Sequence, residues 1–291
     1  MSRVRQQAEH IALCSTSEIS TVEAIMDPPP LQFVKLEICH QGRTALFKYN
    51  RPSSGNSLHP QLLRDAVTAM HWIERQPSIL VVVVTGEGRF FCTGMELLEL
   101  DGEGMSFDIG SDFHELTKSF ILSKKILIGA VNGPAAGYGT SSLALFDLVY
   151  AVPDAYFFTP FVKWGMAAEG ASSVSFPRIM GHQRAASLFL AGDRIMAQVA
   201  HDVGLVSKVL PKEDFLLQVM QIAQGVADSP PGSLRATKEL MKAPVRKDLL
   251  DANDRECLLI HKERYGFSEF RDAVSKFQAE QYEKRKSKSK I

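Results

Sequence analysis

The segment Ser78–Gly86, SILVVVVTG, constrains the fold more than any other part of the chain. Its apolar residues run on without the alternation of apolar and polar side chains that a half-exposed strand shows. A strand of this kind is covered on both faces, which requires a mostly parallel sheet with helices packed against it. The segment ILIGAVNG at residues 126–133 has the same character. The two runs therefore predict the centre of a buried sheet.

Strand-like and helix-like segments alternate from about residue 32 to residue 210. Strands are expected over 33–38, 44–50 and 147–152, and helices over 58–74, 113–124 and 138–146. In LHPQLLRDAVTAMHWIE, for example, the apolar residues recur at helical spacing. From residue 211 onward the pattern is almost entirely helical. This order predicts an α/β fold, with stacked units in a layered core rather than one open doubly wound sheet.

The same patterns divide the chain into four parts. Residues 1–30 are polar and non-periodic, end in DPPP and are expected to form a flexible N-terminal extension. The α/β core is expected over 31–210 and a C-terminal helical region over 211–283. Residues 284–291 form a basic tail, which is most simply a solvated run of charges.

Charge and composition exclude several classes of function. Lysine plus arginine and aspartate plus glutamate are equal at 33 each, so net charge does not favour binding to nucleic acid or to a membrane surface. No apolar run approaches the roughly 20 residues of a membrane span. Scattered cysteines without a CxxC pair predict reduced thiols in an intracellular protein: Cys14, Cys39, Cys92 and Cys257. The isolated histidines lack metal-ligand spacing, so we expect no metal.

A glycine-rich segment, NGPAAGYGTSS at 132–142, lies between an expected strand and an expected helix. It could cradle a phosphate, but it matches neither GxxxxGK[ST] nor GxGxxG. It could be a tight turn that needs glycine only for packing. A third interpretation is an oxyanion hole, in which a backbone N–H polarises a substrate carbonyl. RFFCTGMELLEL at 89–100 has the same order of strand, tight turn and helix, so the two turns could converge on one oxygen.

One carboxylate, Glu169, lies among small and apolar residues in WGMAAEGASS at 164–173. Burial would disfavour its ionised form and make it a stronger base. The alternative is an exposed loop position, where most glutamates lie. Asp147 is better explained as a helix-end or turn residue than as an acid catalyst. The serines near both segments lack the GxSxG turn, which argues against a serine hydrolase.

Four segments together resemble the enoyl-CoA hydratase/isomerase (crotonase) superfamily. They are NRPSSGNSL, VVVVTGEGRFFCTGMEL, AVNGPAAGYGTSSLALFDLVYA and FLAGDRIMAQVAHDVGLVSKVLP, and the resemblance extends from about residue 32 to the C-terminus. It implies a crotonase-like spiral of ββα units, with C-terminal helices that cover the site and assemble a homotrimer or hexamer. It also implies an acyl-CoA thioester substrate and no separate cofactor, because coenzyme A is part of the substrate.

The resemblance assigns an oxyanion hole to the backbone N–H groups of Met95 and Tyr138. Substrate contacts are expected from residues of the same two turns and of the segment before Glu169: Thr93, Gly94, Glu96, Leu97, Gly137, Phe161 and Trp164. Phe270 and Lys276 lie where relatives often contact the adenine.

The carboxylates decide the expected reaction. Ser141 and Phe161 stand at the positions of the two glutamates that a hydratase of this superfamily carries. AAEGASS instead resembles the P-E-G-x-[ST]-[ST] segment of peroxisomal Δ3,Δ2-enoyl-CoA isomerases, with Ala168 in place of proline. The resemblance therefore implies an isomerase of fatty-acid β-oxidation, in which Glu169 is the single base that moves a proton from C2 to C4.

Two alternatives remain open from the sequence. One is an enoyl-CoA isomerase or hydratase of a specialised pathway, such as toxin or siderophore synthesis. The other is a non-catalytic acyl-CoA-binding protein. The final residues, Ser289-Lys290-Ile291, resemble the S-K-L signal, so we expect the peroxisomal import receptor as a partner and a peroxisomal location, or otherwise a cytoplasmic one.

Overall fold

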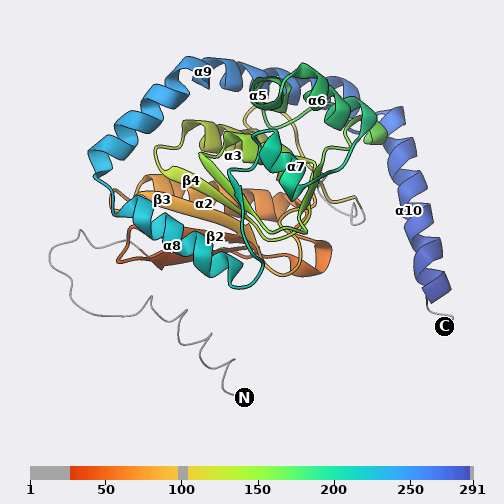
Figure 1. Cartoon of the computed structure of the whole chain (residues 1–291). Helices are drawn as coiled ribbons and strands as arrows, with labels where there is room; N and C mark the ends of the chain where they lie inside the picture. Colours follow the sequence, from red (N-terminus) through yellow and green to blue (C-terminus); the bar gives the residue numbers. More distant parts are fainter. Residues whose placement is uncertain (1–26, 98–103, 289–291) are drawn as a thin grey trace.

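The computed structural model describes residues 27–97 and 104–288. Its main element is a six-stranded sheet in the order β1-β2-β3-β4-β6-β9 (Figure 1). The strands are β1 (Val34–Cys39), β2 (Thr44–Tyr49), β3 (Val81–Gly86), β4 (Ile126–Val131), β6 (Leu148–Ala151) and β9 (Lys208–Val209). Only the β1–β2 pair of this sheet is antiparallel. A smaller sheet in the order β5-β7-β8 contains β5 (Ala135–Ala136), β7 (Tyr156–Phe158) and β8 (Ile195–Met196).

The two continuous apolar runs form the centre of the large sheet, as predicted. All six residues of β3 and all six of β4 are buried. The strands pair in parallel, with Val83 opposite Ile128. Because neither strand has a solvent-facing side, neither needs polar residues at alternate positions.

Helices and helical turns connect and cover the strands. The α-helices are α2 (Pro60–Glu74), α3 (Asp112–Leu122), α4 (Tyr138–Ser141), α5 (Ser172–Met180), α6 (His182–Ala186), α7 (Ala197–Asp202), α8 (Phe215–Ala227), α9 (Pro231–Leu259) and α10 (Ser268–Lys288). Short 3₁₀ turns are η2 (Pro52–Ser54), η3 (Ser142–Leu145) and η4 (Val162–Trp164), and π-helical turns are η5 (Ser187–Ala191) and η6 (Ile260–Arg264). Helix α2 illustrates the local cause: Pro60 starts it, and the His59 side chain accepts the N–H of Gln61.

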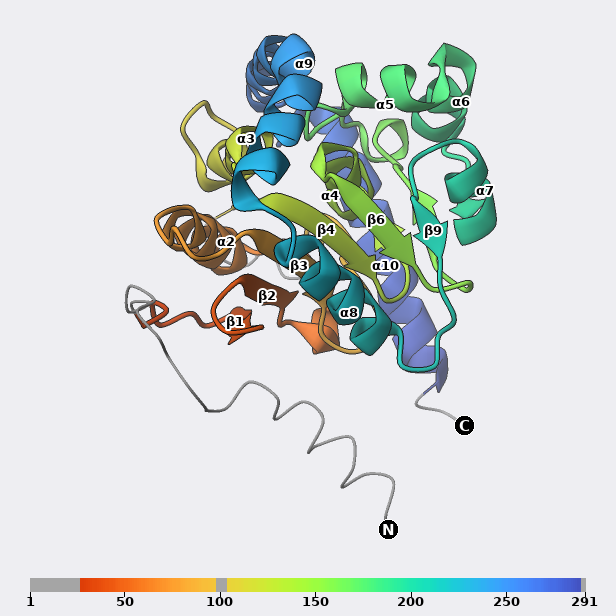
Figure 2. The same ribbon diagram turned by 60° about the vertical axis from the view of Figure 1, so that its left-hand side comes forward.

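The C-terminal helices take different paths over the core. Helix α8 lies against β2, β3 and β4, whereas α9 runs past α3 and α5 (Figure 2). Helix α10 descends along the other side and contacts η4 (Figure 1). These contacts place α9 and α10 beside the loops that carry the predicted site.

Two expectations about local structure need correction. Met95–Leu97 are not helical, and only isolated bridges replace the strand expected before Cys92. Met95 instead forms a parallel bridge with Leu58; residues 98–103 lie outside the described residues. At the C-terminus, α10 continues to Lys288, so residues 284–288 of the predicted basic tail are helical. Residues 1–26 and the predicted signal at 289–291 lie outside the described residues.

Candidate active site

Two glycine turns lie face to face beside the smaller sheet. Gly94 (φ +77°) and Gly137 (φ +51°) both have the left-handed backbone that favours glycine. A β-carbon on Gly94 would lie 2.9 Å from the carbonyl oxygen of Ala136, and one on Gly137 would lie 3.6 Å from the Cα atom of Gly94. The structure thus brings the two predicted oxyanion-hole turns together, and their close approach explains the need for glycine. Their catalytic role stays a prediction.

The backbone N–H of Met95 points away from the segment that pairs with it. The N–H of Leu58 donates to the carbonyl of Gly94 (2.7 Å), and the N–H of Glu96 donates to the carbonyl of Leu58 (3.1 Å). In a parallel bridge the residue between these bonds directs its own N–H to the opposite side. Within the described residues, the Met95 N–H donates no hydrogen bond. It can therefore donate to a substrate oxygen.

The backbone N–H of Tyr138 begins α4 and faces Glu169. The carbonyl of Gly137 accepts the N–H groups of Thr140 and Ser141, both at 2.9 Å, and leaves the Tyr138 N–H outside the helix's own bonds. This N–H lowers the pKa of the Glu169 carboxyl. Consistent with this proximity, a β-carbon on Gly137 would lie 3.6 Å from Oε1 of Glu169. One predicted hole donor therefore lies beside the predicted base.

The side chain of Tyr138 lies in the core. Its ring is fully buried and packs against Phe113 at a centroid distance of 5.0 Å. Its hydroxyl forms a 3.1 Å hydrogen bond with Oγ1 of Thr117, also on α3. The large side chain thus leaves the backbone N–H in place at the turn.

The carboxyl of Glu169 is buried, with 6% of the residue exposed. Its pKa is raised to about 8, chiefly by burial and then by the neighbouring Glu256, while the Tyr138 N–H acts in the opposite direction. No ion pair involves Glu169 within residues 27–97 and 104–288. The alternative of an exposed loop glutamate is therefore wrong. A carboxyl with this pKa holds a proton near neutral pH and is a stronger base than an exposed glutamate when it is ionised.

Glu256 is a second buried carboxylate that the sequence analysis missed. It lies near the end of α9, and its Oε2 and Oε1 accept the backbone N–H groups of Ala171 (2.7 Å) and Ser173 (2.8 Å). These two residues flank the start of α5, just after Glu169. Nothing in the polar sequence around Glu256 distinguishes it from the exposed Glu239 of the same helix, so only the tertiary contact identifies it.

The two positions at which hydratases carry glutamates are filled without a carboxylate. Ser141 is fully buried beside the loop of Glu169, where a β-carbon on Gly170 would lie 2.9 Å from its Oγ. Phe161 is buried as well, and its ring packs 5.5 Å from that of Phe189. Neither position therefore supplies a carboxylate.

Several predicted substrate contacts already have partners within the protein. Thr93 donates to the carbonyl of Ser54 at 3.5 Å, and Leu97 accepts from Gln278 of α10 at 2.8 Å. The carboxylate of Glu96 is buried and accepts from Ser57 (2.6 Å).

Glu96 also pairs with Arg51 at 3.4 Å. This bonding supports a structural role for its side chain, which ties the segment before residue 97 to η2. Any contact of these residues with substrate stays a prediction.

Helix α10 meets the site through aromatic side chains. Trp164 of η4 packs edge-on against Phe277 of α10 at 5.0 Å. Phe270, by contrast, is buried against Tyr265 at 5.1 Å, and Lys276 is exposed on the same helix. Of the two predicted adenine contacts, only Lys276 thus has a side chain that reaches solvent.

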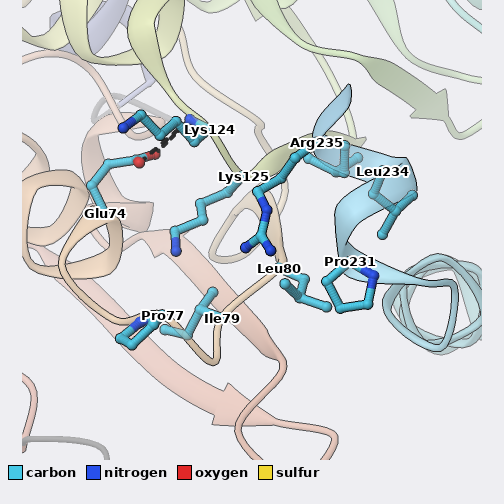
Figure 3. A pocket seen from close by; sticks show the side chains of 10 residues that line it. Glu74, Pro77, Ile79, Leu80, Lys124, Lys125, Pro231, Leu234 and Arg235 are labelled. Atoms are coloured by element: carbon cyan, nitrogen blue, oxygen red, sulfur yellow. Dashed lines mark hydrogen bonds between the residues drawn. The ribbon is translucent and has the colours of Figure 1, made fainter. Parts of the chain in front are cut away.

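A basic pocket lies apart from these residues, at the other ends of β3 and β4. Lys125 and Arg235 both extend into it (Figure 3). Burial lowers the pKa of Lys125, Glu74 opposes this, and Arg235 and Lys124 lower the pKa further. Its remaining lining residues are Pro77, Ile79, Leu80, Ile126, Pro231 and Leu234, none of which belongs to the predicted site.

The structure also describes the cysteines, the metal-ligating side chains and the apolar character of the helices. Cys39, Cys92 and Cys257 are buried and form no disulfide among the described residues, and Cys14 lies outside them. The described chain contains no cluster of three or more metal-ligating side chains. No helix in residues 27–97 or 104–288 combines the length and apolar character needed to cross a membrane.

Comparison with known proteins establishes the family. A family model described as enoyl-CoA hydratase/isomerase matches residues 40–287. A crystal structure of an enoyl-CoA hydratase/isomerase from Pseudoalteromonas atlantica shares the fold with a TM-score of 0.79 and 27% identity, over 86% of this chain and 98% of that one. The chain therefore belongs to the enoyl-CoA hydratase/isomerase (crotonase) family, and the predicted fold is confirmed.

Two curated relatives have nearly the same sequence identity to this chain but different names, so they do not decide its activity. Enoyl-CoA delta isomerase 2 of Rattus norvegicus is 32% identical over 76% of this chain and 57% of its own length. Chromodomain Y-like protein of Homo sapiens is 33% identical over 81% of this chain and 40% of its own length. The chain thus spans about half the length of these relatives. Its sequence identity to the two is nearly equal, although their names differ.

Proposed function

We propose that this chain is a cofactor-independent enoyl-CoA isomerase that moves a double bond from the 3-position to the 2-position of an acyl-CoA thioester. The observation that carries the proposal is the buried Glu169, with a pKa of about 8, beside the turn of Gly137 and Tyr138. Similarity to enoyl-CoA delta isomerase 2 supports the same reaction.

The reaction needs a base and a site for negative charge. Glu169 takes a proton from C2, and the electrons spread through the dienolate to the thioester oxygen. The N–H groups of Met95 and Tyr138 stabilise that oxygen, an effect worth about 10²–10³ in kcat for each donor in comparable sites. Glu169 then returns the proton to C4, which leaves the double bond between C2 and C3 and the substrate's composition unchanged.

Substrate binding strengthens the base in this scheme. The Tyr138 N–H lowers the pKa of Glu169 in the free protein. A thioester carbonyl that accepts this N–H removes its stabilising effect on the ionised carboxylate and so increases the proton affinity of Glu169. The Tyr138 N–H thus acts on the Glu169 carboxyl in the free protein and on the negatively charged thioester oxygen during the reaction.

Hydration fits the site less well. Adding water across a double bond needs a positioned water molecule, usually held by two acids. Ser141 and Phe161 offer no carboxylate, and Phe161 adds apolar surface. We therefore assign isomerisation ahead of hydration.

Replacing the base tests the proposal. Glu169→Gln keeps the size of the side chain and removes its ability to accept a proton, so conversion of a 3-enoyl-CoA should fall by about 10³-fold or more. Hydration of a 2-enoyl-CoA is measured beside it with the wild-type protein. Isomerase activity of Glu169→Gln close to wild type would overturn the assignment.

A non-catalytic acyl-CoA-binding protein is the second candidate. Chromodomain Y-like protein, which is 33% identical to this chain, has a name that states no acyl-CoA reaction. Tight binding of an acyl-CoA without conversion in the paired assays would establish it. Conversion only of an unusual acyl group would instead indicate the specialised pathway, which bulky residues near the site, such as Trp164, support.

We also propose peroxisomal import and a homotrimer or hexamer. Ser289-Lys290-Ile291 supports import. Exposed apolar side chains such as Leu190 (69%) and Leu240 (78%) support an interface between copies. A fluorescent fusion that stays in peroxisomes after deletion of residues 289–291 would overturn the first proposal, and a monomer in sedimentation equilibrium would overturn the second.

A further inference from the structure

Glu256 joins α9 to the loop that carries Glu169. Its two carboxylate oxygens accept two different backbone N–H groups, from Ala171 at 2.7 Å and from Ser173 at 2.8 Å. The residue is 6% exposed, and it lies 85 positions from Ala171 in the sequence. A carboxylate bonded in this way fixes the loop in two places at once.

The loop needs such a fixing contact because its backbone is strained. Gly170 (φ +69°) and Ala171 (φ +57°) are consecutive left-handed residues, and α5 begins at Ser172. A left-handed alanine is disfavoured by roughly 1–2 kcal/mol. Helix α5 receives no side-chain cap from its own N-cap residue. Glu256 supplies the missing acceptor from another helix and stabilises the bend that directs Glu169 toward the Tyr138 N–H.

Glu256 also acts on Glu169 through charge. It raises the pKa of Glu169, while burial raises the pKa of Glu256 and the bonds from Ser173 and Ala171 lower it. The other titratable groups that face the pair are the Tyr138 hydroxyl, the two thiols of Cys92 and Cys257, and the Arg255 guanidinium beside Glu256. Burial raises the pKa of the first three groups, so among these neighbours Glu256 is the one that raises the pKa of Glu169.

We propose that Glu256 is a positioning residue of the active site, which holds the loop 169–173 in its bent form beside Tyr138. It does not touch the substrate. The inference rests on the proposed role of Glu169. It adds that Glu256, 87 positions further along the sequence, affects both the position and the ionisation of that carboxyl.

The test compares Glu256→Gln with a control on the same helix, Asp251→Asn. Asp251 pairs with Lys247 on the surface, so its variant removes one negative charge from α9 without touching the loop. Glutamine at 256 removes the charge and leaves one backbone N–H facing an amide donor. For Glu256→Gln we expect kcat to fall by about 10–10² with KM for the acyl-CoA nearly unchanged, and for Asp251→Asn we expect neither to change.

A second measurement separates positioning from simple loss of stability. Infrared difference spectra against pH follow the protonated carboxyl of Glu169, and Glu169→Gln identifies its band. In Glu256→Gln this band should titrate about one pH unit lower than in wild type. An unchanged midpoint, or a fall in activity matched by an equal fall in the folded fraction, would overturn the inference.

The spectroscopic titration needs no substrate. If the wild-type protein converts no enoyl-CoA, the proposed isomerase function fails, but a shifted band still supports the link between Glu256 and Glu169. If the protein is active and neither kcat nor the band responds to Glu256→Gln, only the inference about Glu256 fails.

Discussion

Helix α9 meets two carboxylates in opposite ways along its length. Near its start, Lys238 and Lys242 pair with Asp147 at 2.7 and 3.8 Å, and Asp147 also accepts the N–H of Leu127 at 2.8 Å. Near its end, the same helix presents Glu256 toward Glu169, and the described residues form no ion pair with either glutamate.

The two regions differ in what they stabilise. Around Asp147 the charges are compensated, so the contact fixes α9 against the ends of β4 and β6. Around Glu169 a compensating cation would favour the ionised carboxylate and weaken it as a base. The lysines that pair with Asp147 thus stabilise the packing of α9. The absence of a cation beside Glu169 among the described residues keeps the proton affinity of that carboxyl high.

Breaking the compensated region should have the largest effect on stability. Lys238→Met leaves Asp147 with a weaker partner in a largely buried place, and we expect the free energy of unfolding to fall by about 3–5 kcal/mol. Urea denaturation measures this change. Lys247→Met, which removes an exposed partner of Asp251, should leave unfolding nearly unchanged. Equal effects of the two variants would contradict the comparison.

Removing the charge of Glu169 should have the opposite effect and increase the free energy of unfolding. Because the folded pKa of Glu169 lies above its unfolded value of 4.5, ionisation opposes folding as the pH rises from 4.5 to 8. Glu169→Gln should therefore raise the free energy of unfolding at pH 8 by about 1–3 kcal/mol, with a much smaller difference at pH 4.5. Denaturation at the two pH values checks the sign, and a variant less stable than wild type at pH 8 would refute it.

The pH dependence of turnover should reflect the same carboxyl. If the free enzyme must carry an ionised Glu169, kcat/KM should rise about tenfold per pH unit up to pH 8 and then level off. Initial rates with a 3-enoyl-CoA across this range give the midpoint. A midpoint near 4.5 would mean that Glu169 titrates as an ordinary exposed glutamate.

The smallest effect is expected at the bend next to Glu169. Ala171→Gly removes the penalty of a left-handed alanine, but glycine loses more backbone entropy on folding, so the net change in the free energy of unfolding should be about 1 kcal/mol or less, toward greater stability. Thermal unfolding measures it. A clear loss of stability would show that the Cβ atom of Ala171 contributes packing that outweighs the strain.

Much of this fold could be predicted from the sequence because its signals are local. The runs at β3 and β4 lack polar residues at alternate positions, so consecutive residues indicate that both faces of each strand are buried. The glycines of the two turns and the glutamate between small residues are equally local patterns, and the structure brings these segments together.

The contacts of α9 could not be predicted in this way. Glu256 and Lys238 are charged residues in a polar helix, and such residues usually face solvent. Their burial follows from how a 29-residue helix crosses the core, which no neighbouring residue encodes. Likewise, the expected helix after Gly94 gave way to pairing with Leu58, a partner distant in the sequence.

The central claim is that one buried carboxylate carries the proton from C2 to C4. It is tested most directly by a single turnover of wild-type protein with a 3-enoyl-CoA deuterated at C2, in ordinary water, followed by mass spectrometry and NMR of the 2-enoyl product. The account predicts that part of the deuterium appears at C4, because the buried carboxyl of Glu169 exchanges slowly with solvent. Product formed without any deuterium at C4 would contradict transfer by a single sheltered base.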